Sequence, residues 1–293
     1  MLDRAELIVE APARPWAGDD VVGLLVWQAV SEADMARLPG LRVIVTGSIG
    51  FDHIDLEAAK RRAVWVCNVP DYCVDEVADS TIALLLALVR GVVVLDRSVR
   101  DGHWDDHAAG LLPRLSDVRL GIVGFGRIGR AVAARAQALE IETWATDPVV
   151  PADAMRLAGA RPALLEELLR NVNAVTLHVP LTKESDKLIG APQLALMRRG
   201  SYLVNTARGQ LVDVPALIQA LDDGQLAGAA LDVLPVEPPT GLESMPSHRR
   251  LIVTPHAAWS SPSAEQEVVR KAAQSLLEAL EGRRPDGLVL AGN

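Results

Sequence analysis

Three side chains that could do acid–base and carboxylate chemistry each follow an apolar, strand-like run. Arg208 lies in VNTARGQLVD, Glu237 in LDVLPVEPP and His256 in TPHAAW. If the preceding runs are strands of one parallel sheet, their carboxyl ends share an edge, and an open sheet binds its ligand at that edge. We therefore expect the three side chains to converge on one crevice.

Together these residue types suit the interconversion of a 2-keto acid and a 2-hydroxy acid. The forked guanidinium of Arg208 can bind a carboxylate through two hydrogen bonds and polarise a developing alkoxide. The imidazole of His256 can exchange a proton with the C2 oxygen near neutral pH, and Glu237 would hold that imidazole in one tautomer. Taken singly, each residue has a plainer explanation: a solvated arginine in a turn, a loop glutamate between prolines, and a histidine that caps a strand.

The strongest local motif is GIVGFGRIGR (121–130), where Gly124, Gly126 and Gly129 form a G-x-G-x-x-G between a strand-like and a helix-like stretch. Such a turn lets backbone approach a pyrophosphate, which the free N–H groups of the following helix also attract. Asp147 ends the next apolar run, 18 residues after Gly129, a spacing that suits the carboxylate for a ribose 2′-hydroxyl. No arginine directly follows Asp147 to accept a 2′-phosphate, so the motif predicts NAD rather than NADP. The plainer alternative is a glycine-rich turn without a ligand.

The elements that position these residues are short apolar strands alternating with helices. We expect strands at 21–27, 42–46, 63–67, 119–124, 141–146, 174–179, 202–206, 227–233 and 251–254. We expect helices at 55–61, 75–90, 127–139, 163–170, 191–199, 213–223 and 264–281. Continuous apolar runs are typical of parallel strands buried on both faces. The pattern predicts an α/β protein of two doubly wound units, and the residues alone leave the last helix open to either unit.

Composition narrows the class of protein. The 293-residue chain is 49% hydrophobic with a formal net charge of −9, and it lacks the basic stripe that a nucleic-acid-binding surface needs. The only cysteines, Cys67 and Cys73, have neither zinc-site nor disulfide-framework spacing, so no metal is expected. The longest apolar run, 82–89, is far shorter than a membrane helix, and MLDRAELIVE lacks the apolar core of a signal peptide. We expect a cytoplasmic protein that binds no membrane.

The motifs of both units resemble the D-isomer-specific 2-hydroxyacid dehydrogenase family. The resemblance rests on VTGSIGFDHIDLEAA and VCNVPDYCVDEVADST in the first unit, and on GFGRIG, NTARG with LVD, LDVLPVEP and TPHAAW in the second. It covers nearly the whole chain. Within the family, CNVP, ADST, NTARG, LVD, TPHAAW and the late GRRPD are most similar to the C-terminal-binding-protein branch, which contains NAD-binding transcriptional corepressors and bacterial relatives.

The resemblance implies a fold of two Rossmann-like domains with parallel sheets, one flavodoxin-like and one dinucleotide-binding. Residues 1–95 and 264–293 would form a discontinuous substrate domain, and residues 96–263 the NAD-binding domain. A homodimer would form through the cofactor domain, with 96–118 as its arm.

The resemblance also implies site residues. Arg208, Glu237 and His256 would be catalytic, with Arg208 on the substrate carboxylate and keto oxygen, and the backbone of Ser48, Ile49 and Gly50 would bind the carboxylate. The residues expected to line the NAD site are Gly124, Gly126, Arg127, Ile128, Gly129, Asp147, Thr81, His178, Val179, Pro180, Thr206, Ala207, Asp232 and Trp259.

Two departures from the family pattern bear on function. Relatives usually open with a further strand and helix before the region corresponding to LDRAELIVE, and the corepressors carry an arginine in the substrate loop where this chain has Thr46. The expected activity is an NAD-dependent dehydrogenase of a 2-keto or D-2-hydroxy acid. The alternatives are an NAD(H)-sensing, corepressor-like interaction protein with weak or no turnover, or a dehydrogenase of a specialised acid such as a phosphonate.

Overall fold

The chain packs into two compact units in the computed structural model, which describes residues 16–241 and 245–292. The first unit comprises Met1–Tyr72 and Glu265–Asn293, and the second comprises Cys73–Ala264. The expectation about the segment LDRAELIVE lies outside the described residues.

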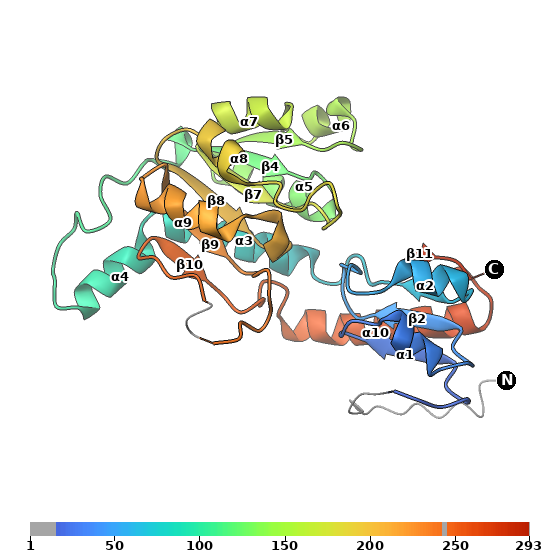
Figure 1. The fold of residues 1–293 in the computed structure, drawn as a ribbon. Helices are drawn as coiled ribbons and strands as arrows, with labels where there is room; N and C mark the ends of the chain where they lie inside the picture. The colour runs from blue at the N-terminus through green and yellow to red at the C-terminus, as the bar shows by residue number, and fades with distance from the viewer. Residues whose placement is uncertain (1–15, 242–244, 293) are drawn as a thin grey trace. The chain divides into compact units, whose positions relative to one another are not determined.

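The first unit is a four-stranded sheet with helices on both faces (Figure 1). Strands β1 (Gly23–Val26), β2 (Val43–Thr46) and β3 (Trp65–Cys67) are parallel, and β11 (Leu288–Leu290) adds to β3 in the antiparallel direction. Helices α1 (Glu32–Ala36) and α2 (Leu56–Arg61) cover an apolar core that includes Met35, Ile44, Ala58 and Val66. Helix α10 (Pro262–Leu280) packs on the other face, where a side chain at Gly23 would collide with Leu276.

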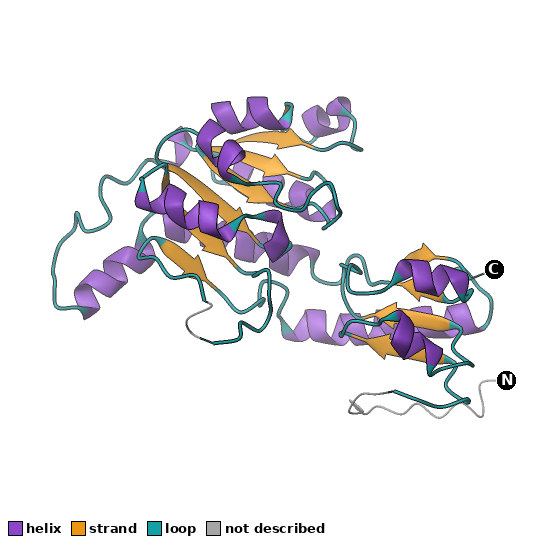
Figure 2. Ribbon diagram, viewed as in Figure 1, coloured by secondary structure: helices purple, strands orange, loops and turns teal. Residues whose placement is uncertain are grey.

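The second unit is a seven-stranded parallel sheet in the order β10-β9-β8-β7-β4-β5-β6. Its strands are β4 (Arg119–Val123), β5 (Glu142–Thr146), β6 (Arg161–Pro162), β7 (Ala174–Leu177), β8 (Ser201–Asn205), β9 (Leu226–Leu231) and β10 (Leu251–Val253). Its α-helices, besides the start of α10, are α3 (Val74–Val89), α4 (Val92–Arg100), α5 (Arg127–Ala138), α6 (Ala152–Leu157), α7 (Leu165–Asn171), α8 (Ala191–Leu196) and α9 (Val214–Asp222). Strand order reverses between β4 and β7, the kind of point at which doubly wound sheets bind nucleotides. Figure 2 shows the strands sandwiched between helices.

The apolar strand runs are explained by burial on both sheet faces. In β4, Leu120 and Ile122 join the core under α3 and α5, whereas Val123 joins the core under α7, α8 and α9. In β8, Val204 joins the core that contains Leu120 and Ile122, and Leu203 joins the core that contains Val123. Because side chains alternate between faces, a strand covered on both sides must be apolar at nearly every position.

The α/β class with two parallel-dominated sheets is confirmed. The boundary between the two units lies earlier in the chain than the expected residue 95. Helix α3 contacts α5, β8 and β9, so it belongs to the second unit, and the division falls between Tyr72 and Cys73. On the C-terminal side it falls between Ala264 and Glu265. Within the described residues, no single helix is long and apolar enough to cross a membrane; α3 and α4 pass that test only as a pair bent by 59°.

Candidate active site

The glycine motif forms a tight turn from β4 into α5. Gly124 has a φ of +94°, and a Cβ there would lie 2.5 Å from the carbonyl oxygen of His178. A Cβ on Gly129 would collide with the carbonyl oxygen of Gly124, so α5 can approach β4 only because residue 129 is glycine. Gly126, in contrast, faces open space, with no heavy atom within 4 Å of a Cβ built there.

That open space lies at the N-terminus of α5, which no side chain caps. Arg127, in the first turn of the helix, is exposed, and the next residue, Ile128, is partly buried. Unpaired N–H groups, the positive end of the helix dipole and a guanidinium together suit a pyrophosphate. The residues present therefore fit a dinucleotide.

Asp147, at the end of β5, is held by backbone. Its Oδ2 accepts a hydrogen bond from the N–H of Phe125 at 2.7 Å, and its Oδ1 accepts from Val149 and Val150 at 2.8 and 2.9 Å. Burial alone would raise the pKa of Asp147, but these donors and the charge of Arg130 outweigh it, so the pKa is lowered. The carboxylate is thus ionised beside the glycine turn, as a ribose-binding acid must be.

Other residues expected near the cofactor gather where β7 and β8 end. The hydroxyls of Thr81 and Thr206 lie 2.9 Å apart, which joins α3 to the end of β8. His178 follows β7, and its Nε2 lies 3.0 Å from the Thr176 hydroxyl. Burial lowers the pKa of His178 to about 3, so its ring is neutral at physiological pH. Val179 is partly buried and packs against the core.

Glu237 and His256 form a close pair. Glu237 Oε2 lies 2.6 Å from His256 Nδ1, and Glu237 Oε1 accepts a hydrogen bond from the N–H of Leu234 at 2.6 Å. Burial would raise the pKa of Glu237, but the hydrogen bonds from His256 and Leu234 and the charges of His256 and Arg208 lower it overall. The His256 side chain is 44% exposed, so its other ring nitrogen can meet a ligand.

Arg208 sits in a turn locked to the loop that carries Glu237. A Cβ on Gly209 would overlap the carbonyl group of Leu234, so the two backbones touch only because residue 209 is glycine. Gln210 Nε2 donates to the carbonyl oxygen of Pro235 at 3.0 Å, which adds a second tie. The turn that carries the partly exposed Arg208 is therefore fixed to the loop of Glu237, and the charge of Arg208 contributes to the lowered pKa of that carboxyl.

Asp232 braces the turn on which His256 sits. Asp232 is 2% exposed, and its carboxylate accepts hydrogen bonds from the Thr254 hydroxyl at 2.5 Å and from the N–H groups of Ala257 and Ala258 at 3.0 and 2.9 Å. Its own carbonyl oxygen accepts from the N–H of His256 at 2.7 Å, and His256 adopts a φ of +53°. A left-handed conformation is uncommon outside glycine, although histidine adopts it more readily than most residues, and these contacts hold His256 in it.

Two side chains that the sequence analysis passed over support this arrangement. Asn205 Nδ2 donates to the carbonyl oxygen of Arg208 at 2.8 Å, and its Oδ1 accepts from the N–H of Ala207 at 3.0 Å. The Thr254 hydroxyl ties β10 to Asp232. The sequence signal that could have identified Asn205 and Thr254 is their position at strand ends, within NTARG and VTPH. Trp259 is partly exposed on the same segment.

The expected substrate loop lies in the first unit, directly after β2. Ser48, Ile49 and Gly50 are partly exposed there. Each of their three carbonyl oxygens accepts a hydrogen bond, from the Val69 N–H, from Asn68 Nδ2 and from the Ser48 hydroxyl, respectively.

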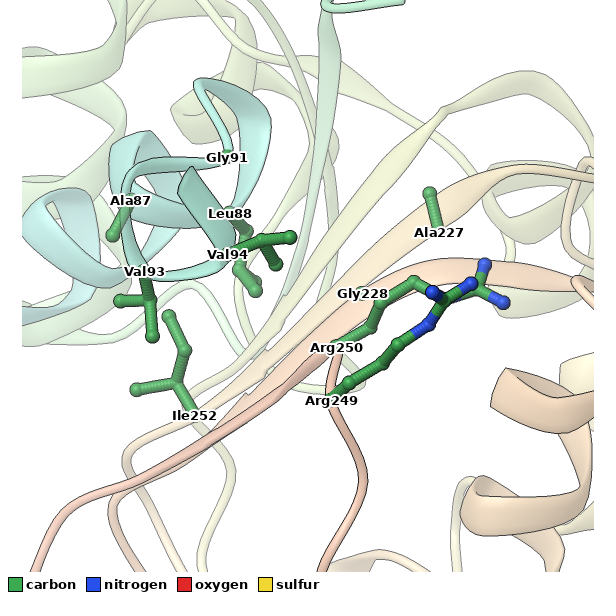
Figure 3. A pocket seen from close by; sticks show the side chains of 10 residues that line it. All are labelled: Ala87, Leu88, Gly91, Val93, Val94, Ala227, Gly228, Arg249, Arg250 and Ile252. Carbon is green, nitrogen blue, oxygen red and sulfur yellow. The ribbon is translucent and has the colours of Figure 1, made fainter. Parts of the chain in front are cut away.

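The described residues offer no metal site, and a small pocket lies elsewhere in the second unit. Among residues 16–241 and 245–292 there is no group of three or more His, Cys, Asp or Glu side chains that could hold a metal ion. Figure 3 shows a small pocket between α3, α4, β9 and β10, where Leu88, Val93, Val94 and Ile252 face one another and Arg249 and Arg250 form one side. None of the residues assigned above to the candidate site lines it.

Comparison with known proteins identifies the family. Residues 82–258 match the D-isomer specific 2-hydroxyacid dehydrogenase NAD-binding domain. The chain is 36% identical over 281 residues to a glyoxylate reductase of Thermofilum pendens, and the match covers 92% of this chain and 81% of the relative. It is 38% identical over 274 residues to a glyoxylate reductase of Korarchaeum cryptofilum, and that match covers 92% of this chain and 82% of the relative. It also resembles the crystal structure of a D-lactate dehydrogenase from Aquifex aeolicus in complex with NAD and lactic acid, with a TM-score of 0.80, 29% identity, and coverage of 92% of this chain and 86% of that one.

The glycine turn, the strand-end pair of Glu237 and His256 and these matches define an NAD-dependent oxidoreductase. The chain belongs to the D-isomer specific 2-hydroxyacid dehydrogenase family. The expected NAD cofactor and the expected hydride transfer between nicotinamide and C2 of a 2-keto or D-2-hydroxy acid are thereby confirmed.

Proposed function

We propose that this chain reduces a small 2-keto acid of the glyoxylate type to its 2-hydroxy acid, with Arg208, Glu237 and His256 as catalytic residues. The observation that carries the proposal is the 2.6 Å contact between Glu237 and the Nδ1 of His256, on a loop locked to the turn of Arg208. The 34–38% identity to five archaeal glyoxylate reductases supports a small substrate.

Each residue has a definite task in the reduction. Bound NADH supplies the hydride that adds to the keto carbon. Arg208 binds the carboxylate and the keto oxygen through its fork, which orients the carbonyl and stabilises negative charge on its oxygen. Because Glu237 occupies the Nδ1 side of the ring, His256 donates its proton from Nε2 to that oxygen. In the reverse direction the same nitrogen accepts the proton.

The remaining predicted contacts belong to the same proposal. The N–H groups of Ser48, Ile49 and Gly50 would bind the substrate carboxylate from the first unit. On the cofactor, Arg127 and the glycine turn would hold the pyrophosphate, and Asp147 the adenosine ribose. The other predicted cofactor contacts are Thr81, Ile128, His178, Val179, Pro180, Thr206, Ala207, Asp232 and Trp259.

The expected closeness to the C-terminal-binding-protein branch is not supported, because the curated relatives that match this chain are glyoxylate reductases. The curated relatives described above carry the names of reductases, and the acid–base pair is assembled in this chain. Both facts favour turnover over a purely sensing role. Thr46 replaces the corepressors' arginine in the substrate loop, which further separates this chain from that branch.

A homodimer through the second unit is part of the proposal. Four large apolar side chains on and after α4 are exposed, with Val92 at 55%, Val99 at 49%, and Trp104 and Leu111 at 93% each. Their number on one short arm supports burial against a second copy of the chain. Light scattering of the purified protein and of the W104S/L111S double variant tests this: a dimer that the double variant dissociates is expected, and a monomeric wild type would contradict it.

The function is tested by following NADH oxidation with glyoxylate, hydroxypyruvate, pyruvate and bulkier 2-keto acids, with NADPH in parallel. We expect turnover to be highest with the smallest acids. Replacement His256→Ala should lower kcat at least about a hundredfold, the usual contribution of a general acid. Arg208→Lys should lower kcat/KM strongly, because a point charge cannot replace the fork. Tight NADH binding without turnover on any keto acid would reject the proposal in favour of a sensing protein.

A further inference from the structure

A chain of side-chain hydrogen bonds lies under the loop that follows β2. Thr46, the last residue of that strand, is fully buried. Its hydroxyl oxygen lies 2.7 Å from the Ser48 hydroxyl and 2.9 Å from Nε2 of His53. Ser48 Oγ in turn lies 2.6 Å from the carbonyl oxygen of Gly50. Four groups are therefore linked in series from an imidazole to the loop backbone.

The direction of this series follows from its last member. A carbonyl oxygen can only accept, so the Ser48 hydroxyl donates its one proton to Gly50. Ser48 must then accept from Thr46, because it has no second proton to give. Thr46, having donated to Ser48, must accept from Nε2 of His53. His53 therefore carries a proton on Nε2, and the series keeps this direction whether the ring is neutral or protonated.

In the loop that follows β2, the carbonyl oxygens of residues 48–50 are hydrogen-bonded, whereas the N–H groups of these residues are not bonded to any described residue. The carbonyl oxygens of Ser48, Ile49 and Gly50 all accept hydrogen bonds from groups of the same unit. Within the described chain, the N–H groups of these three residues donate none, and the residues are partly exposed. A loop whose acceptors are satisfied and whose donors are reachable is suited to an anion such as a carboxylate.

Packing holds the start of the loop from the other side. A Cβ on Gly47 would lie 2.5 Å from two atoms of the Trp27 indole, so the backbone is pressed against that ring. The N–H of Gly47 donates to the carbonyl oxygen of Val26 at 2.9 Å. The loop is thus fixed at Gly47 by packing and at Gly50 by the hydrogen-bond series.

We infer that Thr46, Ser48 and His53 form a positioning relay that holds the 47–50 loop so that its N–H groups bind the substrate carboxylate. The inference rests on the proposed function, which assigns the carboxylate to this loop. The three side chains act through the backbone and need not touch substrate. Their removal should weaken keto-acid binding and leave cofactor binding unchanged.

The test compares the nearly isosteric T46V with the conservative T46S in the full-length protein. Valine keeps the volume and removes the hydroxyl, which breaks the series at its centre. Serine keeps the hydroxyl. For T46V we expect KM for the keto acid to rise about tenfold, the effect of losing a buried hydrogen bond. The NADH Kd, measured by fluorescence, should stay within about twofold. T46S should restore KM.

A second arm tests the donor. H53Q retains an amide N–H that can donate to Thr46 and should keep KM near the wild-type value, whereas H53L should raise it as T46V does. A purely structural role would lower the melting temperature of T46V or H53L without changing KM at a temperature where both are folded. An unchanged KM in folded T46V therefore overturns the relay.

The same variants separate failure of the relay from failure of the proposed function. Oxalate, a non-reacting carboxylate, is titrated into the NADH complex of wild type, T46V and T46S. Weaker oxalate binding in T46V alone supports the relay even if the natural substrate is absent from the panel. Equal oxalate binding in all three overturns the relay while leaving the enzyme's function intact. Wild type that neither turns over a keto acid nor binds oxalate rejects both.

Discussion

Nε2 of His256 is the ring nitrogen left to meet a ligand, because Glu237 lies 2.6 Å from Nδ1. The tautomer is therefore set by a partner that is itself anchored, since the other oxygen of Glu237 accepts from the backbone N–H of Leu234. The lowered pKa of Glu237 means that this partner is ionised throughout the neutral range.

The variant Glu237→Gln should lower kcat for keto-acid reduction by about tenfold or more, with little change in the NADH Kd. Glutamine can keep the contact of its carbonyl oxygen with Leu234, but it places an uncharged amide against His256, so positioning and charge stabilisation of the imidazolium are lost. Steady-state kinetics with saturating NADH measure the effect. A kcat equal to that of the wild type would remove Glu237 from the mechanism.

Stability at acid pH should depend on Asp147. Its pKa is depressed below the ordinary value of 3.8 in the folded chain, so its ionised form contributes stability above that value. This contribution is lost as pH falls through the lower, folded pKa. Melting temperatures of wild type and Asp147→Ala should therefore differ at neutral pH and converge as the pH falls well below 3.8. A gap that stays constant through that fall in pH would contradict the assignment.

Two glycines of the nucleotide turn should respond differently to alanine. Gly126→Ala should leave the melting temperature unchanged and raise the NADH Kd at least about tenfold, because its Cβ enters open space where the pyrophosphate is expected. Gly129→Ala should instead destabilise the fold, since its Cβ meets the carbonyl oxygen of Gly124. Calorimetry and NADH titration on both variants make the comparison. Normal NADH binding by Gly126→Ala would place the pyrophosphate elsewhere.

The role of Asp232 can be separated into bracing and cofactor contact by Asp232→Asn. The amide nitrogen cannot accept, so at least one donor among Thr254, Ala257 and Ala258 loses its partner, at a cost of about 1–3 kcal/mol in the free energy of unfolding. If bracing of His256 is its main role, kcat falls while the NADH Kd holds. A raised NADH Kd with normal kcat would instead favour the predicted cofactor contact.

The long apolar strands and their helices could be predicted from sequence because burial on both sheet faces leaves a strong local pattern. The two-residue β6 could not, because it is too short to leave a pattern, and β11 could not, because its place in the sheet is defined by antiparallel pairing with the distant β3. Helix α3 was predicted almost to its ends but placed in the first unit. Its partners α5, β8 and β9 lie much later in the chain, and local periodicity says nothing about them.

The same limit holds at the site. Arg208, Glu237 and His256 stood out by residue type and by their position after strands, and the structure brings Glu237 to His256 and its loop to the turn of Arg208. The supporting contacts of Asp232 and Asn205 depend on turn geometry that only the folded backbone reveals. The His53 series was equally hidden, because neither a threonine nor a serine at a strand end signals a hydrogen-bond partner several residues away.

The discontinuity of the first unit has a consequence for how the chain folds during synthesis. Residues 73–264 form a complete unit as soon as they have left the ribosome, whereas the sheet of the first unit still lacks β11 and the cover of α10. Residues up to Tyr72 are made before the second unit, yet their sheet is finished only by residues that follow it, from Glu265 onward. Nascent chains should therefore complete the second unit first, and the unit that carries the 47–50 loop only after α10 and β11 have also emerged.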